Sequence, residues 1–134
     1  MANEAIKRYS NSSGDGNVIQ DYNVADGTGI EKGTLLKLTD PRTAIASSGK
    51  GDMIAGICAR EKVANDGRTR ISVHRQGDFD MVASGAIVVG ASVMSAGDVN
   101  EIMAAGALVS GAAIIGYALE TASSTETIQV RLNL

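Results

Sequence analysis

The run MIAGICA occupies residues 53–59, and a similar run, AIIGYAL, occupies residues 113–119. Each run places a single glycine, Gly56 or Gly116, in the middle of an apolar stretch. Apolar runs this short, bounded by turn residues, are typical of buried β-strands, whereas helices need about ten residues or more. The two runs lie 60 positions apart and therefore indicate a repeat within the chain.

Two further pairs of segments keep the same order and nearly the same spacing. Residues 30–36 align with residues 87–93, and residues 71–73 align with residues 128–130, both at an offset of 57. Self-similarity at a steady spacing is the signature of a repeated structural unit. The sequence therefore predicts two pseudo-repeated halves, each a strand, a turn-rich segment and two more strands, which together close one small barrel.

The rest of the chain also reads as short strands separated by Gly, Asp, Ser and Pro. The only helix candidate is short and lies around Asn100 to Ala105. The predicted fold class is all-β: a small barrel or sandwich-like single domain with at most short helices. The predicted strands cover residues 34–39, 53–59, 70–75, 79–82, 86–89, 91–94 and 127–132.

The first 28 residues differ in character from the remainder. Residues 9–17 are rich in Ser, Asn and Gly, and few apolar residues follow them. Such a segment cannot bury enough apolar surface to fold alone. We expect residues 1–28 to form an extended N-terminal arm and residues 29–134 to form the compact β domain.

Composition excludes several classes of chemistry. The 134 residues are 44% hydrophobic but only 3% aromatic, and the formal net charge is −3, the wrong sign for a protein held mainly by nucleic-acid phosphates. One Cys and one His cannot supply a disulfide, a Cys-based zinc site or a multi-His metal centre. No secretory signal is visible at the N-terminus, so we expect synthesis in a reducing cytoplasm. No cofactor is expected.

One uncharged segment, residues 102–119, is long enough to be considered as a membrane span. Acidic residues flank it on both sides, with Glu101 before it and Glu120 after it, and no Lys or Arg lies close by to set an orientation. Its glycines recur about every five residues, which suits turns and short strands better than a helix facing lipid. A small membrane protein stays open as an alternative.

The motifs that could carry catalysis are incomplete. Residues 48–52 resemble part of a phosphate-binding loop but lack its first glycine and its metal-binding hydroxyl. We expect His74 to be an ordinary strand residue, and Asp78 and Asp80 to lie on one solvated strand face. Cys58 lies in an apolar run and is expected to be a buried, inert thiol. No catalytic or metal-binding residue is therefore assigned, and the chain is not expected to be an enzyme.

Four blocks of the sequence resemble a known family. Residues 115–122 followed by residues 127–132 look like the C-terminal signature of tailed-phage head decoration (capsid cement) proteins, in which a glycine-containing turn precedes a final amphipathic strand. Residues 55–59 and residues 30–35 are similar to earlier blocks of that family. The resemblance implies a compact β domain that binds as a trimer to the outside of an assembled head and clamps neighbouring shell subunits.

The resemblance also implies partners and contact residues. The partners would be the major capsid protein and two further copies of the chain, with neither nucleic acid nor membrane, and the protein would reside on the capsid exterior. Family members commonly reach the shell with an N-terminal segment, so the candidate contacts in the arm are Lys7, Arg8, Tyr9 and Tyr22. The other alternative is a small barrel acting as a carrier or binding module, for which Lys50, in a Gly-Lys-Gly turn, is the one tempting attachment point.

Overall fold

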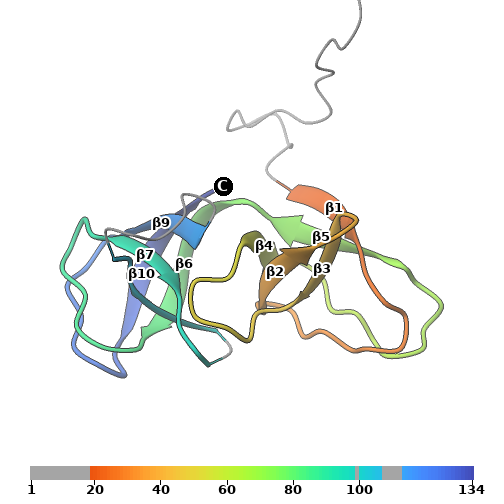
Figure 1. The fold of residues 1–134 in the computed structure, drawn as a ribbon, viewed down its shortest axis with the longest axis horizontal. Helices are drawn as coiled ribbons and strands as arrows, with labels where there is room; N and C mark the ends of the chain where they lie inside the picture. The colour runs from red at the N-terminus through yellow and green to blue at the C-terminus, as the bar shows by residue number, and fades with distance from the viewer. Residues whose placement is uncertain (1–18, 99, 107–112) are drawn as a thin grey trace, which may run out of the picture.

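The computed structural model describes residues 19–98, 100–106 and 113–134 and shows an all-β chain. Ten strands and no helix are present among these residues. Figure 1 shows that they form two bodies side by side, one from each half of the sequence.

The first body is a closed five-stranded barrel in the order β1-β3-β2-β4-β5. Its closing contacts are made by β1, which pairs antiparallel with β5 over five residue pairs and parallel with β3 at Asn23 and Thr43. Short antiparallel ladders join the other neighbours. The strands are β1 (Ile19–Asn23), β2 (Leu35–Thr39), β3 (Thr43–Ala46), β4 (Ile54–Cys58) and β5 (Arg70–His74).

The second body repeats this topology in the order β10-β6-β8-β7-β9. Here β6 takes the place of β1: it pairs antiparallel with β10 over seven residue pairs and parallel with β8. The strands are β6 (Gln76–Ala83), β7 (Ser92–Ser95), β8 (Glu101–Ala104), β9 (Ile114–Ala118) and β10 (Thr127–Asn133).

The predicted all-β class and the division into two repeated halves are confirmed. One detail differs, because each half closes a barrel of its own, whereas the sequence analysis expected both halves to close one barrel together. The physical reason is the first strand of each half. It pairs with both the third and the fifth strand of the same half, so no strand edge is left for the other half to complete.

Three segments differ from their predicted conformation. Residues 86–89 were predicted as a strand, but Ile87 makes only an isolated bridge to Ala122, because the chain turns at Val89 and Gly90, where φ is positive at Gly90. The helix expected around Asn100 to Ala105 is wrong, since Glu101–Ala104 form β8, between β6 and β7. Ile102 is fully buried there, and pairing on both sides of the strand overrides the helix propensity of Glu101, Met103 and Ala104. In addition, β1 lies inside the segment expected to be the arm; the expectation for residues 1–18 concerns residues outside the described part and stays a prediction.

The paired glycines mark a close approach of neighbouring strands in each barrel. A side chain at Gly56 would meet the carbonyl oxygen of His74, and one at Gly116 would meet the carbonyl oxygen of Arg131. Beside each glycine the neighbouring ladder shifts register, between Leu36 and Lys37 or between Val93 and Met94. Such bulges sharpen the twist and coil of a strand, which a small barrel needs in order to close.

The two barrels share apolar core. Leu35, Ile54 and Ile57 of the first barrel pack in one cluster with buried residues of the second, such as Ile102 and Ile115. The first barrel also has a smaller cluster of its own, which includes Leu36, Ala44, Cys58 and Val73. The two barrels are therefore joined through a common apolar core.

Hydrogen bonds across the junction reinforce this shared core. The Oδ1 atom of Asn100 accepts from the Leu35 amide at 2.7 Å. The Ser95 hydroxyl accepts from the Asp52 amide at 3.0 Å and donates to the Gly49 carbonyl at 2.9 Å, and the Ser95 carbonyl accepts from the Gly51 amide. The polar turn of residues 48–52 therefore connects the two barrels through hydrogen bonds to Ser95.

The segment considered as a membrane span contains strands in its described parts. Residues 101–104 form β8 and residues 114–118 form β9, while residues 107–112 lie outside the described part. Within the described ranges, no helix is long and apolar enough to cross a membrane.

Candidate interaction surface

The cleft between the barrels contains the chain's one cysteine and one histidine. It has a volume of about 260 Å³, and Cys58, His74, Phe79 and Asp80 are among its lining residues. The Cys58 thiol is almost fully buried and donates to the carbonyl of Arg60 at 3.0 Å, and burial raises its pKa. A thiol of raised pKa that is not hydrogen-bonded to a base is a poor nucleophile.

The histidine in this cleft lies in β5, beside the aromatic ring of Phe79. Burial, together with the charge of Lys32, lowers the pKa of His74, whose ring lies 5.6 Å from that of Phe79. Over the residues that the structure places, no three His, Cys, Asp or Glu side chains gather closely enough to hold a metal ion. The structure confirms that Cys58 is buried and that His74 lies in a strand, β5, while the inertness of the thiol stays a prediction.

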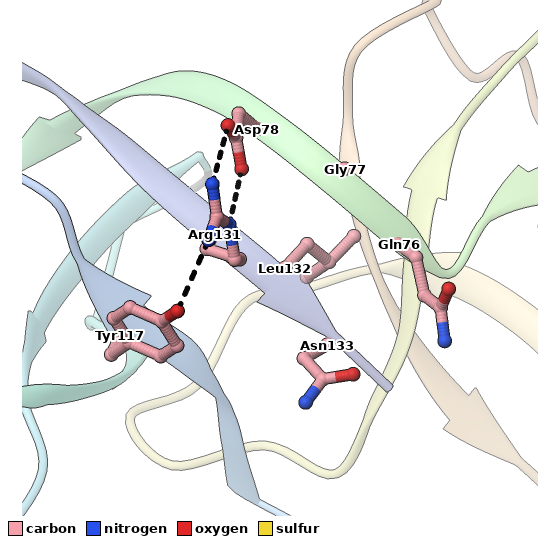
Figure 2. A pocket seen from close by; sticks show the side chains of 7 residues that line it. All are labelled: Gln76, Gly77, Asp78, Tyr117, Arg131, Leu132 and Asn133. Carbon is pink, nitrogen blue, oxygen red and sulfur yellow. Dashed lines mark hydrogen bonds and ion pairs between the residues drawn. The ribbon is translucent and has the colours of Figure 1, made fainter. Parts of the chain in front are cut away.

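A larger hollow lies on the outer face of the second barrel and is open to solvent (Figure 2). Its volume is about 430 Å³. The strands β6, β9 and β10 supply its walls, and the lining residues are Gln76, Gly77, Asp78, Tyr117, Arg131, Leu132 and Asn133.

Arg131 organises this hollow, as Figure 2 shows. Its guanidinium donates to both carboxylate oxygens of Asp78, at 2.8 and 3.1 Å, and to the hydroxyl of Tyr117 at 3.3 Å. The ion pair holds the pKa of Asp78 below its ordinary value. Strand register explains the cluster, because Arg131 stands opposite Asp78 on one side and opposite Tyr117 on the other.

The chemistry of this cluster suits recognition of another protein. Tyr117 is 38% exposed, and it lies beside Arg131, whose side chain is held in place by the ion pair with Asp78. Exposed Tyr and Arg are the residue types most enriched at the energetic centres of protein interfaces. Asp78 was predicted on a solvated strand face, but its pairing with Arg131 was not predicted. The sequence did offer one signal for this pairing, since Arg131 is the only Lys or Arg after residue 75.

A second charged cluster, missed from the sequence, lies at the loop end of the first barrel. Lys62 is only 2% exposed, and its Nζ atom donates to the carboxylates of Asp26 and Asp66 at 2.9 and 2.7 Å. It also donates to the backbone carbonyls of Asp26 and Val63. The residue at the equivalent position of the second barrel is Ala122, since Ile87 bridges to Ala122 as Ile30 bridges to Lys62. Repeat alignment was the signal that could have found it.

The structure separates the contact residues predicted for the arm. Tyr22 lies in β1, half-buried against the first-barrel core, while Lys7, Arg8 and Tyr9 lie outside the described residues. Lys50 is exposed, but its turn is held by hydrogen bonds to the second barrel.

These features define a class of protein: a double β-barrel whose distinguishing chemistry lies in exposed contact surfaces. A family model described as phage cement protein matches residues 14–134, so the chain belongs to the phage cement protein family. Its role is accordingly that of a capsid-associated structural component of a bacteriophage head.

Structural comparison agrees with this assignment at the level of the fold. The N base of head fiber gp8.5 of bacteriophage phi29 matches with a TM-score of 0.55 and 13% identity, over 87% of this chain and 93% of that one. No curated protein matches the sequence significantly.

Proposed function

We propose that the protein binds the exterior of the assembled phage capsid as an oligomer, with a trimer as the expected state, and stabilises the shell by bridging neighbouring subunits of the major capsid protein. The observation that carries the proposal is the family match, which runs through both barrels. The proposal assigns no chemical step to the protein, and the poorly nucleophilic Cys58 thiol supports that reading.

The double-barrel architecture supports bridging in physical terms. A shared core holds the two barrels as one body, so surfaces on different barrels are kept at a fixed spacing. A ligand that binds the assembled lattice but not free subunits stabilises the lattice by mass action. Several weak contacts on one oligomer then combine into high avidity.

In this proposal the N-terminal arm adds a further contact through Lys7, Arg8 and Tyr9, and Tyr22 contributes from β1 in the first barrel. Because β1 begins at Ile19 and closes the first barrel, a deletion that tests the arm has to stop at residue 18. We expect a chain lacking residues 2–18 to keep both barrels and to bind heads more weakly than the full chain does.

The proposal is tested by adding the purified chain to phage heads that lack it. We expect saturable co-sedimentation with mature heads, no binding to unassembled capsid protein, and slower release of packaged DNA on heating. Light scattering after size-exclusion chromatography should give the mass of a trimer. A monomer that does not sediment with heads would contradict the proposal.

A further inference from the structure

Two valines project from the loop that precedes β7 in the second barrel. Val88 is 65% exposed and Val89 is 57% exposed, the two highest values among the exposed large apolar residues that the structure describes. Single exposed apolar residues are common on protein surfaces, but adjacent ones at the tip of a turn form a small contact point.

The equivalent turn of the first barrel has the same backbone and opposite chemistry. Gly33 and Gly90, at positive φ values of 89° and 84°, donate to the carbonyls of Cys58 and Ala118 at 2.9 and 2.8 Å. At the positions of Val88 and Val89 the first barrel carries Glu31 and Lys32. Because the fold accepts charged residues in this turn, the exposed valines are not a requirement of folding.

The valine turn is held rigidly before any partner binds. Ile87 and Ala122 exchange two backbone hydrogen bonds at 2.9 and 2.7 Å, and the Ala91 amide donates to the Val88 carbonyl at 3.0 Å. The Val89 amide donates to the hydroxyl of Thr121 at 3.1 Å. A preorganised tip loses little conformational entropy on binding, so more of its apolar burial appears as affinity.

The two halves of the described chain differ in net charge, and this difference indicates what kind of partner surface would suit the valine tip. Residues 19–75 contain nine Lys or Arg and seven Asp or Glu, giving a net charge of +2, whereas residues 76–134 contain one and six, giving −5. Glu120 and Glu126 flank residues 121–125, the loop in which Thr121 and Ala122 hydrogen-bond to the valine turn. A complementary surface would be apolar at its centre and basic at its rim.

We propose that the Val88–Val89 tip of the second barrel docks into an apolar patch with a basic rim on the assembled capsid. The inference rests on the proposed function and names the part of the chain that makes the contact. A second copy of the chain is the less suitable occupant, because a trimer repeats so small a contact only three times, whereas a capsid lattice repeats it many times. A site repeated across a lattice suits a small contact, since multivalency compensates for its weakness.

The test uses the full chain and matched substitutions in the two equivalent turns. Val88→Ser with Val89→Thr should raise the concentration for half-saturation of heads by about tenfold, because the buried apolar area is lost. Glu31→Ser with Lys32→Thr places the same residues in the first barrel and should leave binding unchanged. Val88→Glu with Val89→Lys, which copies the first-barrel turn, should bind more weakly still. Circular dichroism melting checks that all three variants fold.

The outcomes separate this inference from the proposed function. If the wild-type chain fails to bind heads, the proposed function fails and the inference falls with it. If wild type binds and the Ser-Thr variant of the valine turn binds equally well, the inference alone is overturned. A change of oligomeric mass in the valine variants would also overturn it, because the tip would then contact another copy of the chain.

Discussion

Gly116 offers the sharpest test of how the second barrel closes. A methyl group there would run into the carbonyl oxygen of Arg131, a backbone atom that cannot rotate away, and would lie 3.3 Å from the Cα atom of Leu132. Accommodating Gly116→Ala requires β9 and β10 to separate where Gly116 stands opposite Leu132. The substitution should therefore destabilise the fold without changing its polarity.

The size of the effect follows from what this separation disrupts. Forcing an extra methyl group into a packed site costs about 1–3 kcal/mol. Weakening the adjacent ladder hydrogen bonds adds about 1 kcal/mol. Leu132 and Ile115 are almost fully buried beside the site and would lose packing as well. We expect the free energy of unfolding to fall by about 2–4 kcal/mol, and the melting temperature by roughly 10 °C.

Urea denaturation followed by circular dichroism measures this loss directly. Gly97→Ala is the matched control, because a methyl group at Gly97 meets no atom within 4 Å and its φ is not positive. The control should change stability by less than about 0.5 kcal/mol. Equal stability of the Gly116→Ala and Gly97→Ala variants would refute the close approach of β9 to β10 on which the reasoning depends.

Three further predictions concern buried and ionisable groups. Lys62→Met should lower the urea midpoint at pH 7, because it leaves the carboxylates of Asp26 and Asp66 without their cation. In the wild type, the depressed pKa of Asp66 stabilises the fold above the unfolded-state pKa of about 3.9, so stability should fall as the pH drops below 4, and the variant should lose less. The pKa of His74 from NMR titration should lie below 6.5, and its contribution to stability should decline as pH falls through that value, because burial and Lys32 disfavour the charged imidazole; a pKa above 6.5 would contradict this. Cys58 should resist a thiol reagent in the native state and react fully in denaturant; rapid native labelling would show that the first-barrel core is open.

The strands that sequence predicted well are those with a strong local pattern. The runs around Gly56 and Gly116 became β4 and β9, and the alternating residues 127–132 lie within β10. Their apolar faces are visible without knowledge of the partner strand. By contrast, β1 is mostly polar and owes its conformation to five pairings with β5, more than 45 residues away. Such non-local pairing leaves no local trace in the sequence.

The contact surface was predictable only in part. Asp78 was placed on an exposed strand face, but its partner Arg131 lies 53 residues further along, and only the register of β6 with β10 brings the two together. Whether two repeated halves close one barrel or two is equally undetermined by strand patterns, because both arrangements bury the same faces. The exposed valines at residues 88–89 stand out only when the two repeats are aligned, because the first repeat has charged residues at the same positions.

The shared core has a mechanical consequence. Side chains of Leu35, Ile54 and Ile57 are embedded among residues of the other barrel, and Asn100 ties back to Leu35. Because these contacts run from one barrel to the other, a tensile load applied to one barrel is transmitted to the other. If the protein has the proposed role on the capsid, it acts there as a stiff strut that resists tension until the common core is disrupted.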